Sequence, residues 1–213
     1  MMLYRIVKRT LDLILSLSLW ILTSPLMLLI SICIKLSDGA EVFVGTPRRY
    51  CIDGKTFFMY KFRTMIPNAH NIAMSNGEVK KKLLGDHKLN DDIRVTGVGR
   101  ILRNTDLDEL PQLINVILGD MSMVGPRPFY QEEIQHHLEK HPEDEKYFKN
   151  IFSVKPGLTG IWQVSGRNEI SFKERLKMES EYALKPSILK DIYILLKTPI
   201  VVITRKGVKG SNV

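Results

Sequence analysis

The chain has 213 residues, enough for one hydrophobic core and too few for two domains of ordinary size. Hydrophobic residues make up 44% of it and charged residues 25%, which excludes a mainly disordered or collagen-like chain. With 31 Lys and Arg against 23 Asp and Glu, the formal net charge of +8 favours an anionic partner: nucleic acid, anionic lipid or a phosphorylated substrate. The two cysteines, Cys33 and Cys51, fit neither a disulfide scaffold nor a zinc site, as is usual in a reducing compartment.

An apolar segment near the N-terminus predicts attachment to a membrane. From Leu13 to Ile34 the chain has 22 consecutive residues without a formal charge. A straight helix of that length would measure roughly 33 Å, enough to cross a bilayer core of about 30 Å. The segment is too long for an ordinary signal peptide and lacks a cleavage site with small residues.

Two features of this segment argue against a simple span. Ser24 and Pro25 lie at its middle, where proline removes a backbone hydrogen bond and hydroxyl groups can satisfy the freed carbonyls. Basic residues also flank both ends, whereas a spanning helix carries its excess of Lys and Arg on one side. These residues are Arg5, Lys8 and Arg9 before the segment and Lys35, Arg48 and Arg49 after it. We therefore predict that residues 1–36 form a re-entrant helix-break-helix that returns to the cytoplasmic leaflet at Ser24 and Pro25, with a kinked single span as the alternative.

Residues 37–213 have the composition of a cytosolic domain. Two strands, 41–45 and 56–65, are expected to form a short β-hairpin around the Asp53-Gly54 turn. Helical periodicity covers 107–118, 131–150, 171–184 and 187–198, and the polar stretch 68–92 reads as a surface excursion. Residues 188–206 mix apolar and basic side chains, which suits an amphipathic helix on an anionic membrane surface as well as a core helix. The predicted fold class is α+β, mainly helical.

Adjacent carboxylates in the segment from Thr105 to Gln112 are the first candidates for chemistry. Asp106 and Glu109 have the spacing of a capping box, which would make the acidic residues structural. Pro111 disfavours a helix that begins at Asp106, because the proline would then fall beyond the amides that lack partners. A helix that starts nearer Asp108 leaves Asp108 and Glu109 at its positive end. Such a pair can supply a nucleophilic carboxylate and bind a divalent cation, so capping and function both remain open.

Cationic side chains around this pair suit phosphate groups. Alternation along the second predicted strand places Lys61 and Arg63 on one face. Arg127 lies between Pro126 and Pro128, which present its planar guanidinium from a stiff loop, and Arg167 occupies a second loop of this type. Together with the apolar segment, these cations favour an anionic substrate that is embedded in a membrane.

Six sequence blocks, in this order, resemble the bacterial sugar transferases, the monotopic phosphoglycosyl transferases that start lipid-linked glycan assembly. The blocks are YKFRTM (60–65), LDELPQ (107–112), GDMS (119–122), VGPRP (124–128), KPGLTG (155–160) and VSGRN (164–168). The resemblance implies transfer of a sugar-1-phosphate from a UDP-sugar to polyprenyl phosphate, with Mg²⁺ as cofactor and release of UMP. It also implies the re-entrant helix and a location at the cytoplasmic face of the bacterial inner membrane.

The resemblance further implies roles for individual residues. Asp108 would be the nucleophile and Glu109 its partner, both near the metal, whereas Lys61, Arg63, Arg127, Arg167 and Asp191 would contact substrate or phosphate. The chain departs from the family pattern at Pro47, Cys51, Asp106 and Glu179, which affects substrate choice more than reaction class. Anionic lipids and downstream glycosyltransferases are further expected partners.

Two competing functions follow from the same composition. A non-catalytic, basic adaptor of a glycan-assembly complex could use the membrane segment and the charge, but it would not need the carboxylate pair. A nucleic-acid-binding domain is disfavoured because the basic residues are dispersed and follow no motif for binding nucleic acid.

Overall fold

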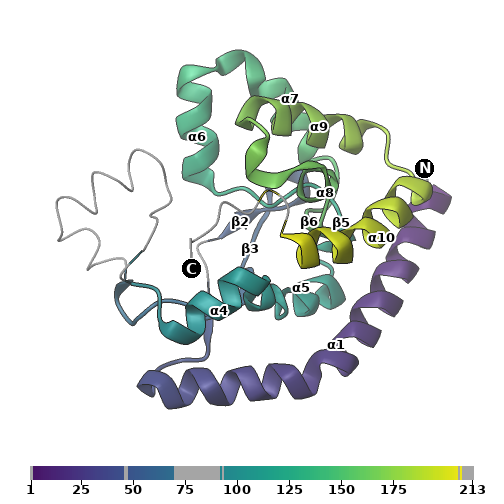
Figure 1. The fold of residues 1–213 in the computed structure, drawn as a ribbon. Helices are drawn as coiled ribbons and strands as arrows, with labels where there is room; N and C mark the ends of the chain where they lie inside the picture. The colour runs from purple at the N-terminus through teal and green to yellow at the C-terminus, as the bar shows by residue number, and fades with distance from the viewer. Residues whose placement is uncertain (1, 46–47, 70–91, 93, 206, 208–213) are drawn as a thin grey trace.

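The computed structural model describes residues 2–45, 48–69, 92, 94–205 and 207 (Figure 1). The described helices are α1 (Met2–Asp38), α4 (Gly97–Thr105), α5 (Gln112–Leu118), α6 (Gln131–Lys140), α7 (Glu145–Ile151), α8 (Ile161–Ser165), α9 (Phe172–Leu184) and α10 (Ile188–Thr204). The described strands are β1 (Phe43–Gly45), β2 (Arg49–Tyr50), β3 (Thr56–Phe57), β4 (Tyr60–Phe62), β5 (Ser122–Val124) and β6 (Gly157–Thr159). This mixture of many helices and few short strands confirms the predicted α+β class. Pro47 and nearly all of the predicted excursion 68–92 lie outside the described residues.

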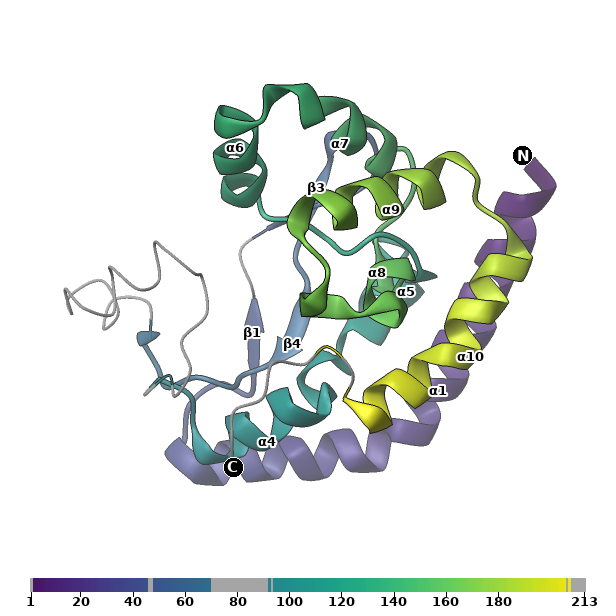
Figure 2. The same ribbon diagram turned by 45° about the horizontal axis from the view of Figure 1, so that its top comes forward.

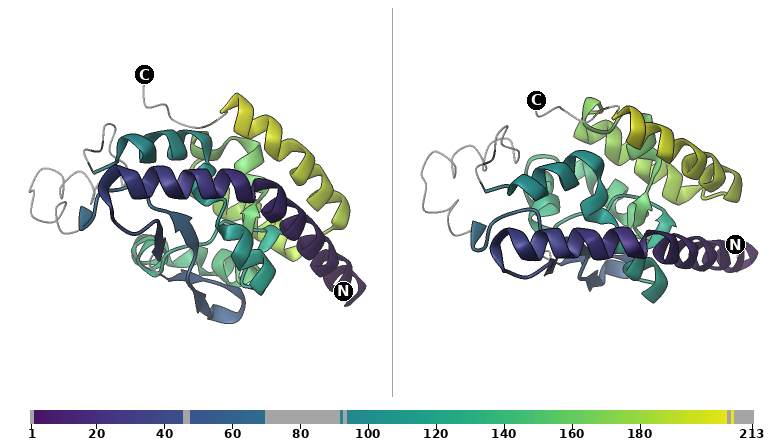
Figure 3. Two further views of the ribbon diagram at one scale, coloured as in Figure 1. Left: turned by 90° about the horizontal axis from the view of Figure 1, so that it is seen from below. Right: turned by 60° about the horizontal axis from the view of Figure 1, so that its bottom comes forward.

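Helix α1 is continuous, so the predicted break into two helices is wrong. Pro25 lies inside it, and Figures 1 and 3 show the helix changing direction along its length. The reason for its continuity is local. Proline at position 25 has no N–H to donate to the Ile21 carbonyl, and Ser24 Oγ donates to this carbonyl instead, at 2.8 Å. Thr23 Oγ1 likewise donates to the Leu19 carbonyl at 2.7 Å. Among the described helices, α1 is the one long and apolar enough to cross a membrane, with a mean hydropathy of 2.2 in its most apolar window.

The first half of α1 holds the rest of the domain through two charged side chains. The Arg9 guanidinium donates to the carbonyls of Val116 and Ile117, at 2.7 and 2.8 Å, near the C-terminus of α5. Asp12, which is buried, accepts hydrogen bonds from Ser122 Oγ and from the Met123 backbone N–H, both at 3.0 Å. Helix α1 therefore positions α5 and β5, the two elements that lead to the candidate site.

The described strands form three separate pairs. β1 pairs with β4, and β2 pairs with β3 around a 3-10 turn, η1 (Ile52–Gly54); both pairs are antiparallel. The predicted strand 56–65 is therefore wrong as a single strand. The buried side chain of Asn115 interrupts it, because the Asn115 amide donates to the Phe58 carbonyl at 2.7 Å and its oxygen accepts from the Tyr60 N–H at 3.0 Å. These bonds fix the start of β4 against α5.

The third pair, β5 with β6, is parallel and holds two loops together. Gly125 donates its N–H to the Thr159 carbonyl at 2.9 Å, and Gly157 donates to the Pro126 carbonyl at 2.8 Å. A Cβ atom on either glycine would collide with the backbone of the other loop. The absence of side chains here lets the loop that carries Arg127 lie directly against the loop from Lys155 to Gly160.

Two of the predicted helices include 3-10 turns in the structure, and a third is longer than predicted. Residues 131–150 do not form one helix, because Pro142 follows the end of α6 and begins a 3-10 turn, η3 (Pro142–Asp144), before α7. Residues 107–118 divide into a 3-10 turn, η2 (Leu107–Glu109), and α5. The prediction for 171–184 is confirmed: α9 begins after a capping box of Ser171 and Glu174. The helix predicted over 187–198 is present as α10 and extends to Thr204.

The helices lie on opposite sides of the strand pairs. Figures 1 and 2 show α4 along the C-terminal half of α1 and α10 beside its N-terminal half, while α6, α7 and α9 gather on the far side. Helix α10 buries Ile194 and Val201 but leaves Leu189, Leu196 and Ile203 more than 70% exposed. Of the two alternatives for this segment, the exposed apolar face favours a surface helix over a core helix.

Candidate active site

The carboxylate pair lies in the short 3-10 turn η2, between α4 and α5. Asp106 precedes the turn in a left-handed conformation, with φ of 57°, and its side chain makes no capping hydrogen bond. The capping-box interpretation of Asp106 and Glu109 is therefore wrong. The placement at a helix N-terminus also needs correction, since α5 begins only at Gln112 and the pair lies one turn before it. The left-handed residue turns the chain so that both carboxylates face β4.

Lys61 on β4 binds both members of the pair. Its Nζ lies 3.4 Å from Asp108 Oδ2 and 2.5 Å from Glu109 Oε1. Burial raises the pKa of the Asp108 carboxyl, an effect that Lys61 partly offsets and the Glu109 charge reinforces. Burial would raise the pKa of Glu109 as well, but Lys61, Arg127 and Arg167 together lower it to about 2. The site thus holds one firmly ionised carboxylate next to a more basic one.

Arg127 is held by a buried carboxylate behind its loop. The Arg127 backbone N–H donates to Glu179 Oε1 at 3.0 Å, and the other oxygen of this fully buried side chain lies 3.4 Å from Arg175 Nε. Burial raises the pKa of Glu179, while Arg175 and the Arg127 amide oppose the rise. Glu179 was recognised in the sequence only as a departure from the family pattern. In the structure, the Glu179 side chain links the backbone of Arg127 to α9.

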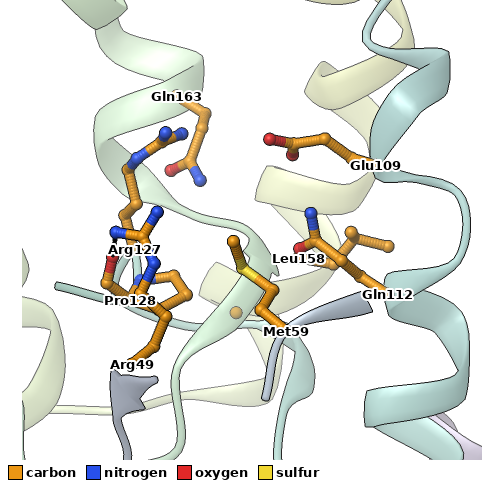
Figure 4. A pocket seen from close by; sticks show the side chains of 9 residues that line it. Arg49, Met59, Glu109, Gln112, Arg127, Pro128, Leu158 and Gln163 are labelled. Atoms are coloured by element: carbon orange, nitrogen blue, oxygen red, sulfur yellow. Dashed lines mark hydrogen bonds between the residues drawn. The ribbon is translucent and has the colours of Figure 1, made fainter. Parts of the chain in front are cut away.

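Glu109 and Arg127 face each other across a pocket with about 250 Å³ of empty space, part of it open to solvent (Figure 4). The residues that line it are Arg49, Met59, Glu109, Gln112, Arg127, Pro128, Gly157, Leu158 and Gln163. Arg49 is a pocket residue that sequence reasoning missed, because it was counted only as a basic flank of the membrane segment. Burial and the nearby Arg127 charge lower the pKa of Arg49 to about 10.

The remaining predicted site residues occupy different places. Arg167 lies within reach of the pair, with its Nη2 2.8 Å from Asp106 Oδ2, and its charge acts on Glu109. Arg63 is buried just after β4 and donates from Nε to the Glu41 carbonyl at 2.5 Å. Asp191 on α10 is also buried and accepts a hydrogen bond from Tyr182 Oη at 2.6 Å, with Lys8 Nζ 3.1 Å away. Neither Arg63 nor Asp191 lines the pocket, and Ser24 and Pro25 lie on α1.

The carboxylate pair fits Mg²⁺ with ligands from a bound substrate. Within the described part of the chain, no group of three or more His, Cys, Asp or Glu side chains could hold a metal ion. Asp108 and Glu109 provide two carboxylates at one place, and Mg²⁺ is commonly bound by one or two carboxylates together with substrate phosphates and water. This donor set therefore suits a metal that arrives with a phosphorylated ligand.

The family of the protein follows from comparison with known sequences. A sequence model of the bacterial sugar transferases matches residues 3–205, and the chain belongs to this family. It is 41% identical over 207 residues to the undecaprenyl-phosphate galactose phosphotransferase of Salmonella typhimurium, covering 95% of this chain and 42% of that protein. It is 40% identical over 203 residues to the exopolysaccharide production protein ExoY of Sinorhizobium fredii, covering 93% and 86%.

A further relative is the UDP-glucose:undecaprenyl-phosphate glucose-1-phosphate transferase of Klebsiella pneumoniae. It is 39% identical over 186 residues, which are 83% of this chain and 35% of that protein. The chain thus spans less than half the length of the Salmonella and Klebsiella relatives and most of the length of ExoY.

Proposed function

We propose that this protein transfers a sugar-1-phosphate from a UDP-sugar to polyprenyl phosphate, undecaprenyl phosphate being the carrier that its relatives' names specify. The observation that carries the proposal is the Asp108–Glu109 pair, bound by Lys61 and faced by Arg127, in a chain with one long apolar helix. Cations around a nucleophilic carboxylate offset the repulsion between that carboxylate and a diphosphate.

Catalysis would proceed through two displacements at one phosphorus atom. An Asp108 carboxylate oxygen attacks the phosphorus that bears the sugar, the bond to the bridging oxygen breaks, and UMP leaves with that electron pair. An oxygen of polyprenyl phosphate then attacks the same phosphorus, which releases the Asp108 carboxylate and forms the polyprenyl diphosphate sugar.

The surrounding residues would bind the phosphates and handle charge. Arg127 and Arg167 hold phosphate oxygens, and Lys61 orients the carboxylate pair. Glu109, ionised at neutral pH because its pKa is about 2, accepts hydrogen bonds or ligates a cation. Mg²⁺ held by Asp108 and Glu109 would neutralise phosphate charge when bound.

The membrane arrangement completes the proposal. Residues 1–36 would follow a re-entrant path, so that residues 37–213 lie on the cytoplasmic face of the bacterial inner membrane. The exposed apolar residues of α10 would rest among anionic lipids. The product would feed downstream glycosyltransferases that build an O-antigen, capsule, exopolysaccharide or glycoprotein glycan.

The decisive test is a search for the covalent intermediate. The protein in nanodiscs is mixed with Mg²⁺ and a panel of UDP-sugars labelled in the sugar, without polyprenyl phosphate, and quenched in acid. We expect UMP release of about one equivalent and label on the peptide that contains Asp108. Asp108→Asn, nearly isosteric but far less nucleophilic, should give neither, whereas Glu132→Gln, at an exposed carboxylate on α6, is the control that keeps the adduct.

Other results would point elsewhere. UMP release that requires polyprenyl phosphate, with no labelled peptide at any time, would favour direct attack by the lipid. No UMP with any sugar or acceptor would favour the non-catalytic adaptor.

A further inference from the structure

Two guanidinium groups line the pocket beside Glu109 without a carboxylate of their own. Among the described residues neither Arg49 nor Arg127 forms an ion pair, although both belong to the pocket lining shown in Figure 4. Arg49 is 6% exposed, and its closest polar contact is a long hydrogen bond of 3.4 Å from Nη1 to the Pro128 carbonyl. A buried cation next to another cation is costly unless an anion joins them.

Three further observations show that the pocket lacks its hydrogen-bonding partners. Arg49 Nε, Gln112 Nε2 and Gln163 Oε1 are all buried and have no partner. Gln112 is only 2% exposed, and Figure 4 shows the Gln112 and Gln163 side chains directed into the space between Arg127 and Glu109. Buried polar atoms in proteins are almost always hydrogen-bonded, so orphaned atoms around one pocket indicate a ligand.

Arg49 is also held rigidly toward Arg127. Its backbone belongs to β2, which pairs with β3, and the next residue, Tyr50, donates its N–H to the Phe129 carbonyl at 3.1 Å. The Arg49 guanidinium stacks on the ring of Tyr130. The β2–β3 hairpin and the loop of Arg127 are thus joined, and the two guanidiniums approach one ligand from two elements.

The hydrogen-bond donors and acceptors that line the pocket indicate which chemical groups the ligand carries. Two guanidiniums and the Gln112 amide suit several phosphate oxygens, and planar guanidinium groups match phosphate geometry. Gln163 Oε1 needs a donor, which an ionised phosphate does not provide but a ribose hydroxyl or a uracil N–H does. A nucleoside diphosphate offers both.

We infer that this pocket binds the nucleoside diphosphate part of the donor substrate and that Arg49 is a second phosphate-binding guanidinium beside Arg127. The inference rests on the proposed function, since it assigns a place to the donor of that reaction. It makes Arg49 a determinant of donor binding, with no role in binding polyprenyl phosphate.

The test compares neighbouring arginines in the full chain in nanodiscs. Arg49→Gln and Arg48→Gln remove the same charge one residue apart, and Arg48 is exposed. We expect Arg49→Gln to raise the KM for the UDP-sugar about tenfold or more, to leave the KM for polyprenyl phosphate within about twofold, and to reduce the thermal stabilisation by UDP. Arg48→Gln should match the wild type in all three measurements, and Arg127→Gln should lose UDP binding.

Arg49→Lys separates binding from folding. Lysine keeps the charge but lacks the planar guanidinium, which can donate two parallel hydrogen bonds. The affinity for UDP should therefore fall about threefold or more, while the unfolding midpoint without ligand stays near that of the wild type. Wild-type affinity for UDP in both Arg49 variants would overturn the inference. An equal rise in the KM of both substrates, together with a lower unfolding midpoint, would also overturn the inference. Arg49 would then only stabilise the loop that carries Arg127.

The result can be told apart from failure of the proposed function. A wild-type protein that releases no UMP from any UDP-sugar would refute the proposed reaction, whereas the comparison of UDP binding would still decide the role of Arg49. A wild-type protein that does not bind UDP would overturn the inference itself.

Discussion

Asp108 and Glu109 are neighbours in the chain, yet their surroundings move their pKa values in opposite directions. Burial dominates at Asp108 and raises its pKa, whereas three cations overcome burial at Glu109 and lower its pKa to about 2. A nucleophile benefits from higher basicity as long as it is ionised at the working pH, and a permanent anion beside it can hold a cation. The two environments thus suit the two adjacent carboxylates to the different tasks that we propose for them.

Replacing Lys61 should move the pH dependence of adduct formation. Lys61 lowers the pKa of Asp108, so Lys61→Gln raises that pKa further and shifts the acidic limb of the rate to higher pH. Lys61→Arg keeps the charge and should leave the limb close to its wild-type position. The measurement is the single-turnover rate of adduct formation as a function of pH, and a limb that moves to lower pH in Lys61→Gln would contradict the assignment.

Residues of the site could be predicted from the sequence only where their neighbours in the chain form an unusual local pattern. Asp108 with Glu109, and Arg127 between two prolines, are chemically unusual within a few residues. Arg49, Gln112 and Gln163 are ordinary in their local sequence, and only the meeting of β2, α5 and α8 gives them a common pocket. Asp191 shows the converse: its family position suggested substrate contact, but the structure places it among Tyr4, Lys8 and Tyr182.

At the scale of elements, Asp12 joins α1 to β5, the strand that precedes Arg127. Its carboxylate accepts two hydrogen bonds from β5, and Lys8 Nζ lies 3.7 Å away. β5 in turn continues into Gly125 and the loop of Arg127. A side chain on α1 therefore helps to set the position of the loop that carries Arg127.

Asp12→Ala should destabilise the protein substantially more than Asp12→Asn. Alanine leaves the Met123 N–H and the Ser122 hydroxyl buried without their acceptor, which costs about 2–4 kcal/mol, whereas asparagine retains an acceptor oxygen at the same place. The unfolding midpoint in nanodiscs measures the difference. Equal midpoints for the two variants would show that these hydrogen bonds contribute little.

The elements themselves were predictable where local signals agreed. Helix α9 has a capping box and helical periodicity, and both hold in the structure. The strand 56–65 and the helix 131–150 were predicted too long for different reasons. Pro142 was visible in the sequence and should have ended the helix, whereas the bonds from Asn115 that interrupt the strand come from a residue 55 positions away.

At the scale of the whole molecule, α1 is longer than a bilayer core is thick. Its 37 residues correspond to roughly 55 Å of helix, well beyond a bilayer core of about 30 Å. Its first half is tied to α5 and β5 through Arg9 and Asp12, and its second half lies along α4. Both ends therefore contact parts of one domain, which favours a bent helix with both ends on the same side.

This arrangement predicts that both ends of α1 face the cytoplasm. A single cysteine is introduced at Leu3 or at Leu36, which are 75% and 80% exposed, in a protein from which Cys33 and Cys51 have been removed. An impermeant reagent should label both positions from the same side of sealed vesicles. Labelling from opposite sides would establish a kinked span and refute the re-entrant path.

The bend should depend on Pro25, and a double replacement of Ser24 and Pro25 tests this. Replacing them by Ala and Leu restores the hydrogen bond to the Ile21 carbonyl from the backbone and removes the side-chain substitute. A straighter apolar helix with all its backbone hydrogen bonds made is more stable across the bilayer. A larger fraction of the double variant than of the wild type should therefore be labelled at the Leu3 cysteine from the opposite side. Ser24→Ala alone, which keeps the proline and the kink, is the control and should retain the wild-type pattern. If the double variant also keeps that pattern, then Arg9, Asp12 and α4 hold the two ends together, and the proline only shapes the helix between them.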